Sequence, residues 1–575
     1  MHDMLISGGT LVDGTGSPSR VADVAVDQGR ITAVGDLAGA QARHEVDARG
    51  LLVTPGWVDV HTHYDGQATW DEVLAPTAWH GVTTLVMGNC GVGFAPVRPD
   101  RHDWLIGLME GVEDIPGTAL AEGIVWDWET FPEYLDALDR RRFTLDVATQ
   151  VPHGAVRAYV MGERGAKNEP ATREEIAAMK AIVKEAIEAG ALGFSTSRTL
   201  AHVAIDGEPV PGTFAAEDEL FGIGAALGEL GTGIFELAPV GAAGEDVIGP
   251  KKEVDWMRRL SAAIGRPVTF ALLQVDRDPG LWSELLELTL IAEAEGAQLW
   301  PQVAGRPFGL LTGHHTTYSL FDAIPEYAEL KAKDLSPDEL FHELSRPEVR
   351  EAIVSWVPPD PALAAAMDDA FSKTYLLGSP PEYEPGPERS VAATAKRSDR
   401  TPLEVAYDAT LDDEGRGLLY LPLLNYSCGD LDAARVMLLH PRAALGLGDG
   451  GAHVGIVCDA STPTFMLTHW TRDRTRGEQL PLEWVVKKQS HDTARLYGLA
   501  DRGTVEEGML ADLNVIDYER LELGTPIAVA DLPAGGRRLL QRANGYVATI
   551  KRGVVTFSEG VDTGERPGRL VRGAR

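Results

Sequence analysis

The chain has 575 residues, of which 44% are apolar and 24% charged, a composition typical of a globular protein with a large core. The 86 acidic residues outnumber the 52 lysines and arginines, and the net charge of −34 disfavours binding to nucleic acid or to an anionic membrane surface. The three cysteines are too few for a disulfide framework, and no uncharged apolar run is long enough to cross a bilayer, so we expect a cytoplasmic protein.

Both ends of the chain show short strand patterns. Residues 1–55 contain alternating apolar segments separated by glycine and aspartate turn signals, which is the pattern of a small antiparallel β unit. Residues 505–575 supply further apolar strands, among them a pair joined at Arg552-Gly553. Because chain ends often lie close together, we predict one small β-sandwich domain formed from both ends.

The middle of the chain, residues 56–504, alternates apolar strands with amphipathic helical segments, which indicates parallel β-α-β units. Eight strand segments can be counted, the number that a (β/α)8 barrel of the TIM type needs to close. They are WVDVHTH, TTLVMGNCG, TLDVATQVPH, ALGFSTS, GIFELAP, PVTFALLQ, AQLWPQVAG and AALGLGDGGAH. We therefore predict an α/β fold with this barrel at its centre.

A long interval, about residues 305–440, separates barrel strands 7 and 8. Part of it is proline-rich and irregular, so we read it as an insertion. Because it follows the carboxyl end of a barrel strand, it would cover the catalytic face as a lid or substrate wall. A peripheral subdomain without a role at the site is the alternative.

Several strand segments end in side chains that can bind a metal ion or move a proton, and in a barrel these ends meet on one face. The group consists of His61, His63, Cys90, His153, Glu236 and Asp449. Their convergence is a stronger signal than any one of these residues.

The first two of these strand ends favour a metal site. His61 and His63 stand one strand repeat apart, so their imidazoles point to the same side about 7 Å apart and can close on one divalent cation. A His-X-His pair also fits an exposed strand edge, but the apolar run before it favours a metal. Cys90 alone would be a small buried apolar residue. Beside two histidines a thiolate ligand becomes competitive, because zinc accepts both nitrogen and sulfur donors.

Asp449 lies in GLGDGGAH, a glycine-rich turn directly after the last strand segment. An Asp-Gly pair often marks no more than a tight turn. In a closed barrel, however, strand eight lies beside strand one, where a carboxylate reaches both the metal and an attacking water. We therefore predict Asp449 as a metal ligand and general base.

Five stretches of the chain resemble the amidohydrolase superfamily, and within it the D-aminoacylase (N-acyl-D-amino-acid deacylase) group. They are PGWVDVHTHYDGQATWD, HGVTTLVMGNCGVGFAP, GALGFSTSR, LGDGGAH and LGLADRGTVEEGMLADLNVID. The resemblance spans most of the chain and implies a metal-bearing barrel, a small β domain from both ends and an insertion before the last strand. It also implies His61 and His63 as first-strand ligands, Cys90 as the cysteine ligand, and Asp449 as ligand and base.

Two histidines that such enzymes carry are missing here. On strand five, in place of histidine, the chain reads GIFELAP with Glu236, and on strand six it reads FALLQVD with Gln274. Glu236 can replace a histidine as a ligand, whereas an amide is a poor one and better suited to hydrogen bonding to substrate. We therefore favour one Zn²⁺ ion over two, held by His61, His63, Asp449 and either Cys90 or Glu236.

Further residues are candidates for contact with the substrate. Arg198 could hold a substrate carboxylate, although a surface ion pair fits it equally well. His153 could polarise the scissile carbonyl or merely pack, and His453 could bind substrate or orient its loop. For the remaining loop residues we favour a structural role: His202, His314, His315 and Tyr318.

These features predict a metal-dependent hydrolase that cleaves a linear amide, most simply an N-acyl (D-)amino acid or a related small amide. The alternatives are a cyclic-amide hydrolase or deaminase on the same barrel and, ranked low, a non-catalytic assembly protein that has lost metal ligands. The expected partner is a small-molecule amide, with neither nucleic acid nor membrane, and a homo-oligomer stays open.

Overall fold

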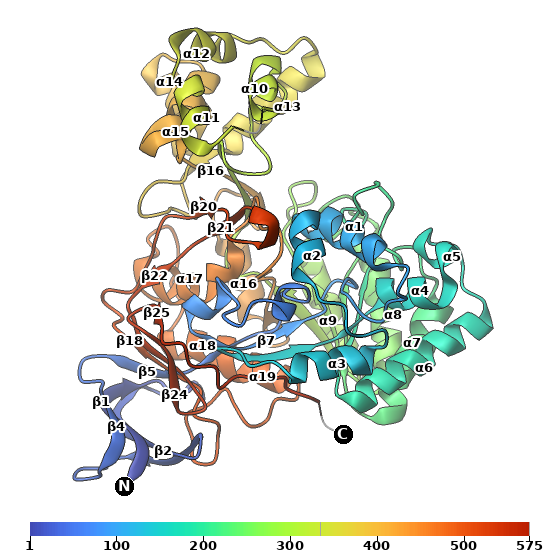
Figure 1. The fold of residues 1–575 in the computed structure, drawn as a ribbon, viewed down its shortest axis with the longest axis vertical. Helices are drawn as coiled ribbons and strands as arrows, with labels where there is room; N and C mark the ends of the chain where they lie inside the picture. Colours follow the sequence, from blue (N-terminus) through green and yellow to red (C-terminus); the bar gives the residue numbers. More distant parts are fainter. Residues whose placement is uncertain (334, 574–575) are drawn as a thin grey trace.

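The computed structural model describes residues 1–333 and 335–573. In Figure 1, the strands of both chain ends lie at the lower left, the barrel helices at the right, and a group of helices from the middle of the chain stands apart at the top. No helix in the described ranges is long and apolar enough to cross a bilayer.

The eight predicted barrel strands are all present, and neighbouring strands run parallel. They form two sheets, β6-β7-β8 and β9-β10-β11-β12-β13-β17, in which only Gln150 separates β8 from β9. The strands are β6 (Trp57–Asp59), β7 (Val82–Met87), β8 (Asp146–Thr149), β9 (Val151–Pro152), β10 (Gly193–Ser197), β11 (Ile234–Ala238), β12 (Val268–Ala271), β13 (Leu299–Val303) and β17 (Ala444–Leu445). A parallel bridge between Thr62 and Gly450 links the ends of the first and last strands.

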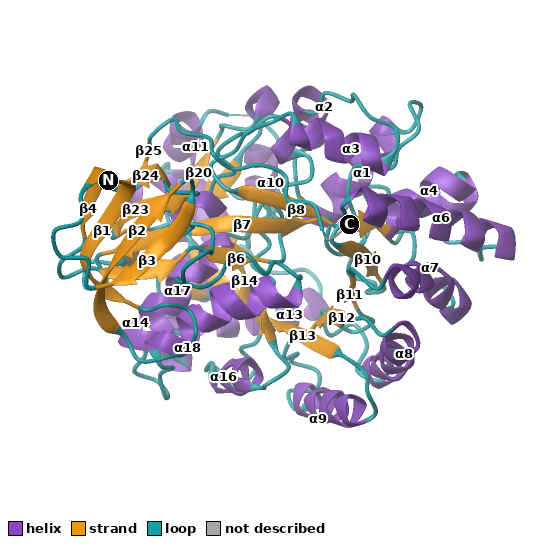
Figure 2. Cartoon of the chain, turned by 90° about the horizontal axis from the view of Figure 1, so that it is seen from below, coloured by secondary structure: helices purple, strands orange, loops and turns teal. Residues whose placement is uncertain are grey.

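Helices follow these strands and pack on their outer side (Figure 2). The helices are α1 (His102–Glu113), α2 (Gly117–Gly123), α3 (Phe131–Asp139), α4 (His153–Met161), α5 (Glu163–Ala166), α6 (Arg173–Ala189), α7 (Glu217–Leu230), α8 (Gly249–Ile264), α9 (Leu281–Ala294) and α16 (Asp432–Leu439). Helix α6 shows why they form, since Thr172 and Glu175 make a reciprocal capping box at its start. The arrangement is a TIM-barrel-like α/β fold, as predicted, and full closure of the barrel stays a prediction.

The two chain ends share one nine-stranded sheet with the order β25-β24-β23-β18-β5-β1-β2-β3, and β4 pairs with β1. Its strands are β1 (His2–Leu11), β2 (Arg20–Asp27), β3 (Arg30–Gly35), β4 (Ala42–Asp47), β5 (Leu52–Pro55), β18 (Leu513–Ile516), β23 (Tyr546–Lys551), β24 (Val554–Ser558) and β25 (Val561–Asp562). The antiparallel pair β5 and β18 joins the two ends. A second layer that would make this unit a sandwich stays a prediction.

A buried cluster of charges, here called the junction cluster, ties this β sheet to the barrel. Asp146 of β8 accepts hydrogen bonds at Oδ2 from Arg502 at 2.8 Å and Arg552 at 2.9 Å, and Lys551 Nζ lies 2.8 Å away. Lys551 also donates to Asp512 at 2.7 Å. Burial opposes ionisation of Asp146, but the three cations outweigh it and hold the pKa of that carboxyl below its usual range.

Between β13 and α16, the described residues form a small three-stranded sheet and six α-helices. The elements are β14 (Phe308–Thr312), α10 (Pro325–Lys331), α11 (Pro337–Leu344), α12 (Pro347–Val354), α13 (Pro361–Lys373), β15 (Tyr375–Leu376), α14 (Val391–Ser398), α15 (Pro402–Gly415) and β16 (Leu419–Leu424). Most of these helices begin with a proline, which suits a first helical turn. The helices enclose an apolar core of their own, centred on Phe321, Tyr327 and Tyr407, separate from the barrel core.

Candidate metal centre

A cavity of about 420 Å³ lies at the carboxyl ends of the barrel strands. Its polar lining residues are His61, His63, Cys90, Glu113, Thr199, His202, Asp449 and His453. The rest of the lining is apolar and comes partly from the barrel and partly from β14 and β16. A cavity of this size, with a few convergent polar groups in apolar surroundings, is typical of a small-molecule site.

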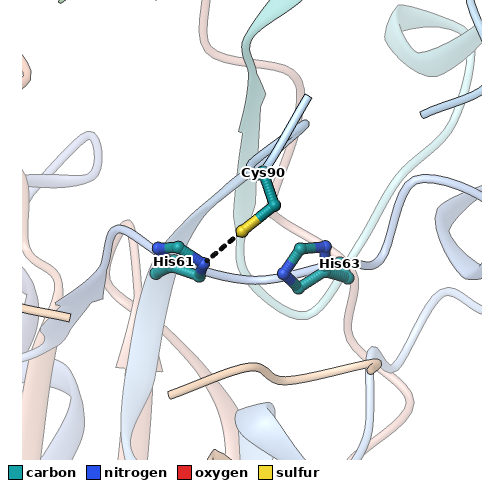
Figure 3. Close-up of side chains that lie close together, drawn as sticks. All are labelled: His61, His63 and Cys90. Carbon is teal, nitrogen blue, oxygen red and sulfur yellow. Dashed lines mark hydrogen bonds between the residues drawn. The ribbon is translucent and has the colours of Figure 1, made fainter. Parts of the chain in front are cut away.

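His61, two residues after β6, presents one ring nitrogen to the cavity. Its Nδ1 lies 2.8 Å from Gln302 Oε1 on β13, which fixes the ring. Its Nε2 lies 3.3 Å from Cys90 Sγ (Figure 3) and 3.4 Å from Asp449 Oδ1. Burial lowers the pKa of His61 to about 4, so the imidazole is neutral and can donate its Nε2 lone pair to a metal.

His63 has a similar arrangement. Its Nδ1 lies 3.2 Å from Oε1 of Glu113, which is the last residue of α1, but the two atoms do not form a hydrogen bond. Its Nε2 lies 3.8 Å from Asp449 Oδ1. Burial and the nearby His61 lower the pKa of His63 well below its usual value, so this ring is neutral too.

Cys90 follows β7 in the left-handed backbone conformation, with φ of 55°. This turn directs Sγ toward His61 and leaves the Cys90 N–H to donate to Glu236 Oε2 at 2.9 Å. Donor atoms of His61, His63 and Cys90 all lie within 4.8 Å of one another. Burial and the carboxyl groups of Glu236, Glu113 and Asp449 raise the pKa of the thiol, which a bound cation would reverse.

Three buried carboxyl groups surround these donors. Burial raises the pKa of Glu236 and of Asp449 to about 8 each. Burial and the nearby Asp449 raise the pKa of Glu113 well above its usual value. Oε1 of Glu236 has no hydrogen-bond partner among the described residues. Buried acids without cationic partners are costly, and a divalent cation is the species that would relieve that cost.

The donor set fits a zinc ion. The Nε2 atoms of His61 and His63, Sγ of Cys90 and Oδ1 of Asp449 face one another, and N, S and O donors together suit Zn²⁺. Figure 3 shows the first three side chains turned toward a common point. Nδ1 of His61 binds Gln302 away from this point, as is usual for a metal-binding imidazole, and Nδ1 of His63 faces Glu113 without a hydrogen bond.

Besides Glu236, whose carboxylate binds the Cys90 N–H, three predicted site residues do not line the cavity. His153, at the start of α4, binds Thr196 Oγ1 through Nδ1 at 2.8 Å and Glu219 Oε1 through Nε2 at 2.9 Å, so both ring nitrogens are engaged. Arg198 donates to Glu253 Oε2 at 2.8 Å and to the Ala215 carbonyl at 2.8 Å.

The third of these residues, Gln274, connects β12 to the segment after β16. Its side chain accepts a hydrogen bond from the Ser427 N–H at 3.2 Å and donates to the Pro279 carbonyl at 3.3 Å. His453, by contrast, lines the cavity, and its N–H donates to the Glu113 carbonyl.

Three residues at the site were missed or undervalued in the sequence. Glu113 gave no signal, because it lies in a helix remote in sequence from the strand end that it contacts. Gln302 lies on a predicted strand, but its contact with His61 depends on the register of β13. His202, expected to be structural, lines the cavity and binds Ser197 Oγ through Nδ1 at 2.9 Å.

The strand ends that would carry the two missing histidines contribute apolar side chains to the cavity. Ala238 ends β11 and Ala271 ends β12, and both line the cavity together with Leu273. Alanine and leucine side chains offer no donor atom to a second metal ion.

Comparison with known proteins places the chain among relatives of the same length. It is 28% identical over 576 residues to a D-aminoacylase of Alcaligenes xylosoxydans xylosoxydans, covering 99% of this chain and 97% of the relative. An N-acyl-D-aspartate deacylase of the same organism is 38% identical over 194 residues, which are 34% of this chain and 36% of that protein.

Solved structures share the fold. A D-aminoacylase structure described for its binuclear metal centre has a TM-score of 0.66 at 24% identity, with 100% of both chains covered. An N-acyl-D-glutamate deacylase of Bordetella bronchiseptica, complexed with zinc and a phosphonate inhibitor, has a TM-score of 0.66 at 23% identity, with 99% of both chains covered. The amidohydrolase family model matches residues 44–557. The chain therefore belongs to the amidohydrolase family, as the sequence resemblance predicted, and is a hydrolase of carbon–nitrogen bonds other than peptide bonds.

Proposed function

We propose that the protein is a metal-dependent amidohydrolase that cleaves a linear amide, either an N-acyl (D-)amino acid or a related small amide. The observation that carries the proposal is the convergence of His61 Nε2, His63 Nε2, Cys90 Sγ and Asp449 Oδ1 at the cavity. The relatives named D-aminoacylase and N-acyl-D-aspartate deacylase support linear amides over cyclic ones.

One Zn²⁺ ion is the proposed cofactor, held by His61, His63, Cys90 and Asp449. Glu236 lies next to this set, with Oε2 bound to the Cys90 N–H and Oε1 unpartnered, and would serve as a further ligand. A single ion is favoured over two because apolar side chains occupy the ends of β11 and β12.

The reaction follows from the placement of these groups. When bound, the metal ion polarises the substrate carbonyl and lowers the pKa of water. Asp449 accepts the proton of the attacking water at a carboxylate oxygen and delivers it to the nitrogen of the leaving amine. His453 borders the same cavity and would hold the substrate carbonyl or amide. His153 takes a structural role in this scheme, because its ring nitrogens are both engaged.

The domain organisation belongs to the same proposal. Residues 1–55 and 505–575 form the β domain and residues 56–504 the barrel, with the insertion at about 305–440. Of the insertion, Phe308, Leu423 and Leu424 line the cavity, which supports a role as a substrate wall.

The test combines metal content with a substrate panel. After dialysis against Zn²⁺, we expect about one tightly bound ion per chain, and hydrolysis of N-acyl amino acids or simple N-acyl amines but not of hydantoins, lactams or aminopurines. Asp449→Asn should lower kcat by about 10³-fold, while Asp100→Asn, an exposed aspartate, should not. Failure to bind zinc would favour the non-catalytic alternative, and full activity of Asp449→Asn with unchanged zinc content would refute the base assignment.

A further inference from the structure

The cavity lining contains acidic side chains but no lysine or arginine among the described residues. Glu113 and Asp449 line the cavity and Glu236 lies behind Cys90. The carboxyl groups can be neutral or negative and never positive. A substrate carboxylate that entered this cavity would lose its hydration without gaining a cationic partner, which costs several kcal/mol.

Two arginines, on the segments that follow β10 and β12, donate to other parts of the chain. Arg198 is paired with Glu253 and with the Ala215 carbonyl. Arg277 donates to the backbone carbonyls of Gly244 at 3.2 Å and Glu245 at 2.8 Å, on the loop that follows β11. Neither guanidinium is among the side chains that line the cavity, so neither offers a substrate there the bidentate contact by which arginine holds a carboxylate.

A zinc ion in the centre does not supply the missing positive charge. Histidine binds zinc as the neutral imidazole, so His61 and His63 would bring no charge, while the Cys90 thiolate and the Asp449 carboxylate would bring two negative charges to the divalent cation and make the occupied centre neutral overall. Glu113, next to His63, can only make the surroundings more negative.

The wall opposite the donors is apolar. It is formed by side chains from three barrel strand ends and from the insertion, namely Ala238, Ala271, Leu273, Phe308, Leu423, Leu424 and Leu447. Leu423 is 39% exposed and extends this surface to the mouth of the cavity. Apolar groups placed against this wall gain about 25 cal/mol per Å² removed from water.

Resting on the proposed amide hydrolysis, we propose that the substrate is an N-acyl amine that carries no free carboxylate and places an apolar group against this wall. The selected class includes N-acyl amino alcohols and N-acylated residues whose carboxyl group is itself blocked. Free N-acyl amino acids would be poor substrates.

The decisive experiment compares N-acetyl-leucinol with N-acetyl-leucine, in both enantiomers, on the zinc-loaded protein. The two compounds share their apolar group and have amines of similar basicity, and differ in the charge at one position. We expect kcat/KM to be at least about 10-fold higher for the neutral compound. Equal values, or a preference for N-acetyl-leucine, would overturn the inference.

A binding measurement separates this inference from the proposed function. N-methanesulfonyl-leucinol and N-methanesulfonyl-leucine resist hydrolysis, and calorimetry should give at least about 10-fold tighter binding of the neutral one. If neither acetyl compound is cleaved, the proposed function fails, but the sulfonamide pair still decides the question of charge. Tighter binding of the carboxylate, or no binding of either compound, would contradict the inference.

A substitution provides an independent check. Leu423→Arg places a guanidinium at the mouth of the cavity, and Leu423→Gln is the uncharged control of similar length. We expect Leu423→Arg to raise kcat/KM for N-acetyl-leucine several-fold over Leu423→Gln and not to raise it for N-acetyl-leucinol. If the arginine gave no such selective gain, the lack of a cation would not be what excludes carboxylates.

Discussion

Two buried groups of charged residues in this protein differ in whether their carboxyl groups have cationic partners. In the junction cluster, Asp146 contacts three cations, and Lys551 is shared with Asp512. At the cavity, Glu113, Glu236 and Asp449 lie close together without a lysine or arginine partner among the described lining residues. Both groups contain fully buried charged side chains, such as Asp146 and Lys551 in the first and Glu113 and Glu236 in the second, so burial alone does not distinguish them.

On this difference we assign the junction cluster a structural role and propose a functional one for the carboxyl groups at the cavity. Buried charges that are paired with opposite charges stabilise one arrangement of the chain. Buried carboxyl groups without such partners raise the free energy of the folded protein until a cation binds next to them. The pKa directions follow this division, since the pKa of Asp146 is lowered while those of Glu236 and Asp449 are raised to about 8. Strong shifts toward the neutral acid, in a cavity, mark the functional group.

The largest expected effect comes from breaking the satisfied cluster. Asp146→Asn removes the charge that compensates Arg502, Arg552 and Lys551, and we expect a loss of about 3–5 kcal/mol of stability. The shift of the urea midpoint measures it, with Asp100→Asn as the exposed control. A loss below about 1 kcal/mol would mean that the junction cluster is not structural.

Acid should also destabilise the protein, because it protonates a second carboxyl that is paired with cationic groups, that of Glu384. Burial opposes ionisation of Glu384, but hydrogen bonds from His469 and Arg474 lower its pKa to about 2. Because this value lies below that of the unfolded chain, about 4.3, Glu384 stabilises the fold fully above pH 4.3, and the contribution disappears as the pH falls toward 2. We expect it to be about 2 kcal/mol after screening by solvent.

Thermal unfolding between pH 6 and 3 measures this contribution. The midpoint temperature of the unmodified protein should fall more steeply with acid than that of Glu384→Gln, which has no carboxyl to titrate at this position. Parallel profiles for the two proteins would show that Glu384 is not stabilised by its partners.

A smaller effect is expected from a substitution among the carboxyl groups at the cavity. Glu113→Gln keeps the shape of the side chain next to His63 and removes its charge, so zinc affinity should weaken by about 10–100-fold. Competition with a chelator gives the affinity, and Glu122→Gln, an exposed residue of α2, is the matched control. Unchanged affinity would mean that Glu113 neither orients His63 nor contributes charge to the centre.

The smallest effect is expected at Arg198. Because its guanidinium binds Glu253 and does not line the cavity, Arg198→Gln should change kcat/KM by less than about threefold. A rise in KM confined to carboxylated substrates would instead show that Arg198 reaches the substrate. That result would also argue against the neutral substrate.

The barrel strands were predictable because each is a short apolar run bounded by turn residues. Seven of the eight predicted segments contain the observed strands in full, and β7 begins one residue before its segment, at Val82. The donors His61, His63, Cys90 and Asp449 follow from the same rule, since they end strands whose carboxyl ends meet. His153 and Arg198 also end strands, but their side chains turn to Glu219 and Glu253, which lie far along the sequence. The position of a residue at the end of a strand predicts that it lies near the carboxyl face of the barrel. Its hydrogen-bond partner there depends on tertiary packing, which the sequence pattern does not reveal.

The insertion helices enclose their own apolar core, while β14 and β16 carry Phe308, Leu423 and Leu424 to the cavity. One wall of the pocket thus comes from a unit that is separate in the chain from the residues proposed to bind zinc. In evolutionary terms, we expect selectivity and reactivity to vary on separate segments of the gene, with changes in the insertion altering the substrate while the proposed hydrolytic centre is retained.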